Sequence, residues 1–410
     1  SISRYLNQAI YDDDEQTFFK GVKQLLPGEF MIVTPDKKIK KNRWYNLQEK
    51  ISPRENLRSL KTEIMELIYN TTNLHMRSDV PVGLCLSGGL DSSVLLNSIS
   101  RTGNMTDNFT CLSLGFGKDF SEKVWINSAT NQFNVKSIML DFTPEDFVSS
   151  LKPMMWHLES PIGGLMNCAF KLIFEKACEL GITVLQDGTG LDEAFGGYKY
   201  HHNLFIAKAM IDNHPKLNSY ILDYMSTWSC SRKDVLTAAK HSLNSENLAI
   251  DGSIPIRKDV LSEEIKNFKS SSKNIKFNTG NFLTDSLCNY LHIEKIPRNM
   301  KMKDRLSMAY SKELRLPFLD KRLIELGLSL PLELLFKDGL TKSVIREAFL
   351  GIMDNRVLLA QKRSIQAPQG KWLKIQPMKS YVYSILNSKS FAQRGLFNID
   401  ACKKAYDDYC

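Results

Sequence analysis

One seven-residue turn constrains the fold of this chain more than any other feature of its sequence. The turn, Ser87 to Ser93, reads S-G-G-L-D-S-S; it follows the apolar run Pro81 to Leu86 and precedes the amphipathic segment Val94 to Ile99. This order predicts a strand, a glycine turn and the start of a helix. Adjacent glycines let the backbone approach a ligand closely, and Asp91 and the serines suit a first helical turn. We therefore expect an anion, most simply phosphate, at this helix N-terminus.

Three other small-residue loops compete with this interpretation, and each fails on its residues. A Walker-A loop needs a Lys before its Ser or Thr, whereas Leu90 and Asp91 precede these serines. A nucleophile elbow needs Gly two places before its Ser, where Cys85 stands. Neither Gly115-Phe116-Gly117 nor Gly188-Thr189-Gly190 completes a dinucleotide fingerprint. What remains is the pyrophosphate loop of enzymes that split ATP between its α and β phosphates, with a plain Ser- and Gly-rich turn as the alternative.

Strand and helix patterns alternate around the turn. Apolar strand patterns at 109–116, 137–142 and 182–186 are separated by amphipathic helical ones. Crossover units of this kind predict an α/β fold with a doubly wound parallel sheet, in which ligands bind beyond the carboxyl ends of the strands. The segment Asp187 to Gly190 also follows a strand end, so one nucleotide could contact both loops. From Asp212 onward the pattern becomes helical and irregular, and residues 269–280 are the best candidate for a mobile loop.

The amino-acid composition argues against several classes of protein. Apolar residues make up 43% of the 410 residues and charged residues 24%, and the apolar runs are too short for a membrane span, so we expect a cytoplasmic protein without membrane contact. The net charge is +9, but Lys and Arg are scattered, which argues against nucleic-acid binding. Cysteines show no zinc spacing, and Cys85, Cys111 and Cys178 lie in apolar patterns that predict buried, reduced thiols.

The first 52 residues contain one probable pair of strands. Residues 29–34 and 39–45 flank a Pro35-Asp36 turn and predict a hairpin. A two-stranded unit cannot bury itself, so we expect it to pack on another body.

With these loops in hand, the chain resembles the synthetase domain of glutamine-dependent asparagine synthetases, a family that includes lactam synthetases and macrocycle-forming relatives. Four segments carry the resemblance, in order along the chain: Arg77 to Ser93, Asp187 to Tyr198, Asp304 to Asp320, and Ala360 to Ser364. The resemblance covers nearly the whole chain. It implies the fold of ATP pyrophosphatases, also called adenine nucleotide alpha hydrolase-like, with a helical C-terminal part.

The resemblance also implies a domain organisation. Residues 1–52 are similar to the tail and junction of an N-terminal glutaminase domain, whose catalytic Cys this chain does not contain. Residues 53–410 would form the synthetase domain, with an α/β core over about 53–212 and a helical part over about 213–410. A separate glutaminase domain or subunit is then expected to supply ammonia, and a homodimer is compatible with the family.

Family chemistry implies two steps: a substrate carboxylate attacks the α-phosphate of ATP, and ammonia then displaces AMP from the acyl-adenylate. Lys362 matches the family's catalytic lysine, while Asp91 and Asp192 match its Mg²⁺-linked aspartates, with a plain helix cap as the alternative for Asp91. The expected nucleotide contacts are Leu86, Ser87, Gly88, Gly89, Asp91, Ser92, Ser93, Leu112, Leu114, Asp187, Gly188, Lys342 and Lys362. Lys342 and Arg346, four apart on one helix face, suit phosphate contacts or a solvated face equally.

Thr189 is the departure from the family pattern that matters for the substrate. Asparagine synthetases usually carry an acidic residue there, and Thr neither holds an ammonium group as a carboxylate would nor acts as a base. Asp187 in place of the usual Ser moves an acid two positions upstream. Glu313 and Asp304 match acidic positions near the family's substrate pocket, so Thr189 and Glu313 join Lys362 and Asp91 as candidate catalytic residues.

These residues predict an ATP-dependent amide synthetase that forms AMP and pyrophosphate and acts on aspartate or another metabolite or sugar acid. Two rival functions stay open. One is lactam or macrocycle formation by an internal amine, and the other is a binding scaffold without catalysis.

Overall fold

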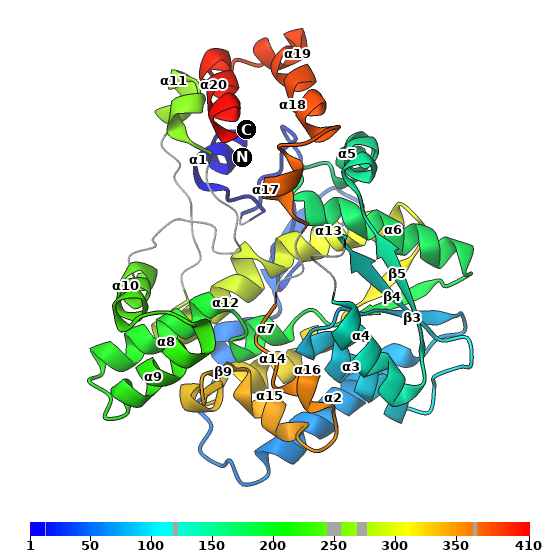
Figure 1. Ribbon diagram of the computed structural model, residues 1–410, viewed down its shortest axis with the longest axis vertical. Helices are drawn as coiled ribbons and strands as arrows, with labels where there is room; N and C mark the ends of the chain where they lie inside the picture. The colour runs from blue at the N-terminus through cyan, green and yellow to red at the C-terminus, as the bar shows by residue number, and fades with distance from the viewer. Residues whose placement is uncertain (13, 118–121, 244–255, 269–276, 364–366) are drawn as a thin grey trace.

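A five-stranded parallel sheet forms the centre of the protein in the computed structural model, which describes residues 1–12, 14–117, 122–243, 256–268, 277–363 and 367–410. The strand order is β5-β4-β3-β6-β7, and every neighbouring pair is parallel. Figure 1 labels β3, β4 and β5 of this sheet. The strands are β3 (Val82–Cys85), β4 (Thr110–Gly115), β5 (Lys136–Asp141), β6 (Val184–Asp187) and β7 (Glu313–Arg315).

Helices cover both faces of this sheet. Side chains alternate along a strand, so Leu84 and Cys111 enter one core cluster while Leu112 and Leu185 enter another. The first cluster is closed by α2 (Leu60–Met76), α3 (Leu90–Arg101) and α4 (Lys123–Phe133). The second is closed by α5 (Pro144–Leu158), α6 (Leu165–Glu179) and α13 (Ile296–Met308). The predicted doubly wound α/β fold is confirmed.

The strand order reverses direction beside β3. From β3 the chain adds β4 and then β5 on one side, and later adds β6 and β7 on the other. In open parallel sheets ligands bind at such a reversal, outside the carboxyl ends of the two strands concerned. The residues that follow β3 and β6 therefore lie where a ligand is expected.

The fifth strand comes from a part of the chain that we expected to be helical. Strand β7 begins at Glu313, far beyond residue 212, and α13 from the same region covers a face of the sheet. The α/β core therefore draws on more of the chain than 53–212. The strand escaped prediction because it has three residues, of which two are charged.

The remaining helices form a mostly α-helical region, which begins at residue 199, before the boundary near Asp212 that we expected. Its longer members are α8 (Lys199–Ile211), α9 (Leu217–Trp228), α10 (Arg232–Leu243), α12 (Phe282–Asn289), α14 (Lys321–Leu328), α15 (Ser343–Ala348), α18 (Met378–Leu386) and α20 (Ile399–Tyr409). A short hairpin, β8 (Phe336–Lys337) with β9 (Leu340–Thr341), leads into α15. Of the loop expected at 269–280, residues 269–276 lie outside the described residues.

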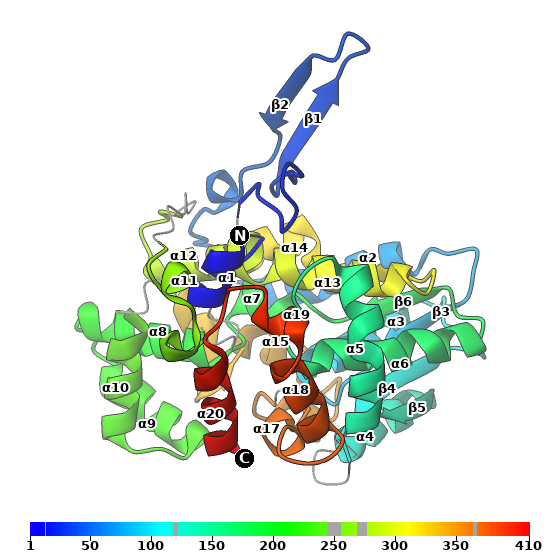
Figure 2. The same ribbon diagram turned by 90° about the horizontal axis from the view of Figure 1, so that it is seen from above.

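The predicted N-terminal hairpin is present and stands off the body (Figure 2). Its strands β1 (Glu29–Val33) and β2 (Ile39–Arg43) pair antiparallel, and α1 (Ile2–Gln8) precedes them. No helix in the described ranges is long and apolar enough to cross a bilayer. Cys111 is buried as expected and Cys85 is partly buried, but Cys178 is exposed on α6, so the prediction is wrong for that thiol.

Candidate active site

The loops after β3 and β6 touch each other at the reversal of strand order. The two strands are paired in register, with Cys85 opposite Asp187, so their loops leave the sheet side by side. The contact is close: a Cβ added at Gly188 would lie 3.0 Å from the Ser92 amide nitrogen. Only a residue without a side chain allows this approach. The two loops that we expected to share one nucleotide are therefore neighbours.

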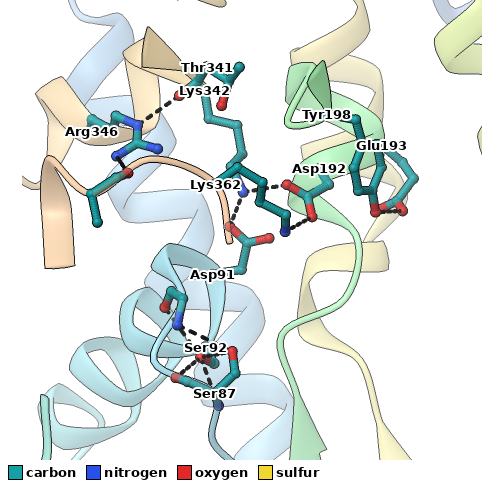
Figure 3. A network of polar contacts seen from close by, with 12 residues as sticks. Ser87, Asp91, Ser92, Asp192, Glu193, Tyr198, Thr341, Lys342, Arg346 and Lys362 are labelled. Carbon is teal, nitrogen blue, oxygen red and sulfur yellow. Dashed lines mark hydrogen bonds and ion pairs between the residues drawn. The ribbon is translucent and has the colours of Figure 1, made fainter. Parts of the chain in front are cut away.

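The first loop folds back on the start of α3. The Ser92 hydroxyl donates to the Ser87 carbonyl at 2.6 Å, and the Ser87 amide donates to Ser92 Oγ at 3.2 Å (Figure 3). The Gly88 amide already has a partner, because it donates to Glu122 Oε2 at 3.2 Å. The Ser93 hydroxyl is buried and without a hydrogen-bond partner among the described residues. The turn is thus held by its own serines, by the Glu122 carboxylate and by Arg363, whose guanidinium donates to the Gly88 carbonyl at 2.7 Å.

Two lysines and two aspartates form a buried network beside this loop (Figure 3). Lys342 Nζ donates to Asp91 Oδ1 and, at 2.5 Å, to Asp192 Oδ1. Lys362 Nζ donates to the other oxygen of Asp192. Lys342 is only 1% exposed, so its charge is compensated by these carboxylates and not by water. Residues from three distant parts of the chain therefore meet at one point.

Burial and charge shift the titration of this network. Burial raises the pKa of Asp91, and the neighbouring Asp192 carboxylate raises it further. Burial also opposes ionisation of Asp192, but the ammonium groups of Lys342 and Lys362 outweigh it and lower the pKa of Asp192. Burial alone would lower the pKa of Lys362; Asp192 and Asp91 reverse this and raise it. Lys362 therefore stays charged at neutral pH.

Asp91 and Asp192 fit the role of magnesium ligands. Both carboxylates contact the same ammonium group, so they are close enough to share one cation. No cluster of three or more His, Cys, Asp and Glu residues suited to a metal occurs within the described ranges. Mg²⁺ is commonly held by one or two carboxylates, with phosphate oxygens and water completing its shell. A pair of aspartates beside the 87–93 turn, where we expect phosphate, matches that donor set.

Lys342 and Arg346 do not share one helix face as expected, because Lys342 lies just before α15 and only Arg346 lies within it. Lys342 precedes α15 with a left-handed backbone, φ 54°, and points at the two aspartates. Arg346 is 4% exposed and donates to backbone carbonyls on both sides: Thr341 at 2.7 Å, Leu358, and Ala360 at 3.0 Å. Arg346 therefore fixes the segment that leads to Lys362. Of the two surroundings that we considered for it, the solvated face is wrong, because Arg346 is buried.

A cavity of about 220 Å³ joins these groups. The predicted site residues that line it are Leu86, Ser87, Asp91, Ser92, Leu112, Leu114, Asp187, Gly188, Thr189, Asp192 and Lys362. Gly88, Gly89, Ser93 and Lys342 lie behind this lining or beside it, in the same loop or network. Met166, Phe170 and Ile173 of α6 add an apolar wall, which with Leu112 and Leu114 suits a flat aromatic ring such as adenine.

Glu313 and Asp304 do not join the site. Glu313 begins β7 and is paired with Val184, the first residue of β6, so it lies at the amino end of the sheet, opposite the loops. Its side chain is 57% exposed and bonds Arg315 at 2.7 Å. Asp304 is exposed on α13 and lines no part of the cavity. Both became candidates because they match acidic positions of the family pattern, and that match does not show which end of β7 carries Glu313 or which face of α13 carries Asp304.

Lys303 is a site residue that the sequence did not indicate. From α13 its Nζ donates to Asp187 Oδ2 and to Thr189 Oγ1, each at 2.8 Å, and it lines the cavity. Burial would raise the pKa of Asp187, but Lys303 and Thr189 outweigh it and hold that pKa below its usual value. Asn299, one turn earlier, lines the same wall. The sequence of α13 does not single out Lys303 as a site residue, because several other basic residues surround it.

Tyr198 and Glu193 complete the far side of the cavity. The Tyr198 hydroxyl donates to Glu193 Oε1 at 2.7 Å, and Lys295 Nζ lies 3.5 Å from the Tyr198 ring centre. Burial and the Glu193 charge raise the pKa of Tyr198 well above its usual value. The adjacent His201 is fully buried, which agrees with the packing role suggested by the sequence pattern.

A second and larger hollow, of about 620 Å³, lies elsewhere. It is bordered by residues near Pro53, by α8 and by the start of α12, and none of the four motif segments lines it. The chemistry-bearing side chains therefore gather at the smaller cavity.

Known proteins resemble this chain over most of its length. The model of the asparagine synthase family matches residues 63–410. "Asparagine synthetase [glutamine-hydrolyzing] 1" of Bacillus subtilis is 28% identical over 91% of this chain and 60% of its own. A putative asparagine synthetase of Mycobacterium tuberculosis is 23% identical over 97% of this chain and 62% of its own. The chain thus spans about three fifths of the length of these relatives.

Solved structures give weaker likenesses. An NH3-dependent NAD synthetase from Campylobacter jejuni covers 48% of this chain and 98% of its own, with 14% identity and a TM-score of 0.28. An NMN synthetase from Francisella tularensis covers 62% of this chain and 96% of its own, with 11% identity and a TM-score of 0.24.

Proposed function

This chain belongs to the asparagine synthase family, and from that premise we propose that it is an ATP-dependent amide synthetase that releases AMP and pyrophosphate. One observation carries the proposal. The cavity at the reversal of strand order gathers the 87–93 turn, the 187–190 loop, two aspartates and Lys362. These are the groups that cleavage of ATP at its α-phosphate requires: a cradle for pyrophosphate, ligands for a metal and a fixed cation.

In the first step an oxygen of the substrate carboxylate attacks the α-phosphorus, and the bond to the bridging oxygen of pyrophosphate breaks. The turn at 87–93 would hold the departing pyrophosphate with its serines and backbone N–H groups. Asp91 and Asp192 would hold Mg²⁺, which supplies positive charge to the phosphate oxygens. Lys342 and Lys362 compensate the charge of these aspartates in the structure. If Mg²⁺ took over that role, the two ammonium groups would be released to bind phosphate oxygens.

In the second step ammonia attacks the acyl carbon of the adenylate, AMP leaves, and the nitrogen loses a proton to form the amide. Negative charge develops on the acyl oxygen and then on AMP. Lys362, which stays protonated, is the group suited to meet that charge. We expect the ammonia to come from glutamine, by way of a glutaminase domain or subunit.

The test is a screen of carboxylic acids with MgATP and ammonium, in which AMP and pyrophosphate are quantified by chromatography. Acid-dependent release of both products in equal amounts supports the proposal. Release of ADP and orthophosphate contradicts it. Release that needs no ammonium points to the internal-amine rival, and a lack of nucleotide binding by calorimetry supports the scaffold rival.

A further inference from the structure

We infer that Lys303, with Asp187 and Thr189, selects a carboxylic acid that carries a hydrogen-bond acceptor, such as a hydroxyl or carbonyl group, where aspartate carries its ammonium group. The inference rests on the proposed function, because it concerns the acid that would be activated there. Its basis is the pattern of hydrogen bonds that the Asp187, Thr189 and Lys303 side chains make on that wall of the cavity.

Three hydrogen-bond donors already bind the Asp187 carboxylate. Its Oδ1 accepts from the Thr189 amide at 2.9 Å and from the Thr189 hydroxyl at 2.5 Å, and its Oδ2 accepts from Lys303 at 2.8 Å. The charge of this acid is therefore already compensated by Lys303 before a ligand binds. An ammonium group brought to this wall would meet the Lys303 cation beside a carboxylate that Lys303 already compensates, which disfavours it.

Lys303 has a donor to spare. An ammonium group carries three N–H bonds, and Lys303 uses two of them, on Asp187 and Thr189. No third acceptor for it occurs within the described residues. The side chain is 9% exposed and lines the cavity, with the Phe170 ring centre 5.2 Å away. The remaining N–H is thus available to an oxygen of a ligand in a desolvated place, where such a bond discriminates well.

Two other polar side chains that line the cavity are compatible with the role assigned to Lys303. The Asn299 amide, on the same helix and one turn away, also lines the cavity and adds both a donor and an acceptor. Glu193 is the other carboxylate to weigh: its Oε2 has no hydrogen-bond partner among the described residues. Its Oε1, however, accepts from Tyr198, and Lys295 lies 3.7 Å from that oxygen, so this anion already has a cation.

The experiment compares three acyl-sulfamoyl adenosines that differ in one substituent: the aspartyl analogue with an ammonium group, the succinyl analogue with hydrogen, and the malyl analogue with a hydroxyl. Calorimetry gives the dissociation constant of each and of AMP. We expect the malyl analogue to bind about tenfold or more tightly than the aspartyl one, with the succinyl analogue between them. Equal binding, or tighter binding of the aspartyl analogue, overturns the inference and leaves the proposed function intact.

Variants test whether Lys303 is the cause. The double variant Asp187→Asn/Lys303→Met removes the donor without leaving a buried charge unpaired, and it should lose the preference for the malyl analogue. Asp12→Asn/Lys301→Met is the matched control, since Lys301 bonds Asp12 at 2.8 Å from the same helix and does not line the cavity. The control should keep the preference; a preference that survives in the first variant overturns the assignment. Failure of AMP and all three analogues to bind the unmodified protein contradicts the proposed function itself.

Discussion

At the scale of single residues, Lys342 shows how far a side chain's role depends on its partners. From the sequence it was a candidate phosphate contact on a helix face that could equally be solvated. In the structure it is almost fully buried and joins Asp91 to Asp192, which are 251 and 150 residues away along the chain. A local sequence pattern does not show such partners, because helical spacing describes the faces of one helix and not the elements that pack against it. Arg346 differs from expectation for the same reason.

Replacing Lys342 by methionine should destabilise the protein. The substitution keeps the length of the side chain but leaves two buried carboxylates with one ammonium group. Breaking a buried ion pair by removing one partner costs about 3–5 kcal/mol. Urea unfolding should show a free energy of unfolding lower by about that amount. Lys337→Met, at an exposed ion pair with Glu347, is the control and should change stability by less than about 1 kcal/mol. Equal stability of both variants would refute the structural role.

Lys362→Ala should act on the reaction more than on nucleotide binding. If its charge meets the charge that develops on the reacting groups, removing it should slow acid-dependent pyrophosphate release by about 10²- to 10³-fold. The affinity for ATP should change less, because the turn at 87–93 remains. Single-turnover release and calorimetry separate the two quantities, with the exposed Lys321→Ala as control. A loss confined to ATP affinity would count against this role.

At the scale of elements, the sequence predicted the parts of the site that strand ends build. Apolar runs before Ser87 and Asp187 identified β3 and β6, and the alternation of patterns gave a parallel sheet, so their loops had to meet at one edge. It did not predict β7, which is too short to show a period, or Lys303, whose helix is rich in basic residues. It placed Glu313 at the site although strand pairing puts it at the opposite edge. The direction of a strand and its pairing partners depend on tertiary structure, which the sequence pattern of one segment does not report.

Gly188→Ala should push the two loops apart. The added Cβ would lie 3.0 Å from the Ser92 nitrogen and 3.1 Å from the Asp91 carbonyl carbon, and these backbone atoms are less able to yield than a side chain. We expect the affinity for ATP to fall about tenfold or more, since misplacement of a phosphate cradle weakens several contacts at once. Gly370→Ala, whose Cβ would meet only the end of the Tyr409 side chain, is the control. Unchanged ATP affinity would show that the loops do not act together.

At the scale of the whole molecule, the buried histidines couple folding to pH. His201 and His202 are at most 2% exposed, and burial lowers the pKa of each to about 3. His202 accepts a hydrogen bond from Trp228 at 3.2 Å, which requires the neutral ring. In the unfolded chain both would titrate near pH 6.5. Below that pH the unfolded state binds protons that the folded state does not, so stability is full above about 6.5 and falls as the pH is lowered towards 3.

The free energy of unfolding should therefore fall between pH 7 and pH 5, by about 2 kcal/mol for each of these histidines. Urea unfolding at the two pH values measures the difference. In His202→Gln the difference should shrink by about 2 kcal/mol, because one proton-binding group is gone from the unfolded state. His157→Gln, at an exposed position, should leave it unchanged. A pH dependence that is the same in all three proteins would contradict the linkage.

The two walls of the small cavity come from separate stretches of chain. One is built by residues 87–93 with Lys362, and the other by residues 187–189 with two side chains of α13. Under the proposed function, the two α13 side chains can change without altering residues 87–93, whereas Gly188 cannot, because it lies against the Ser92 backbone. Exchanges at positions 299 and 303 alone would then alter which acid is accepted, while the residues proposed to bind ATP stay the same.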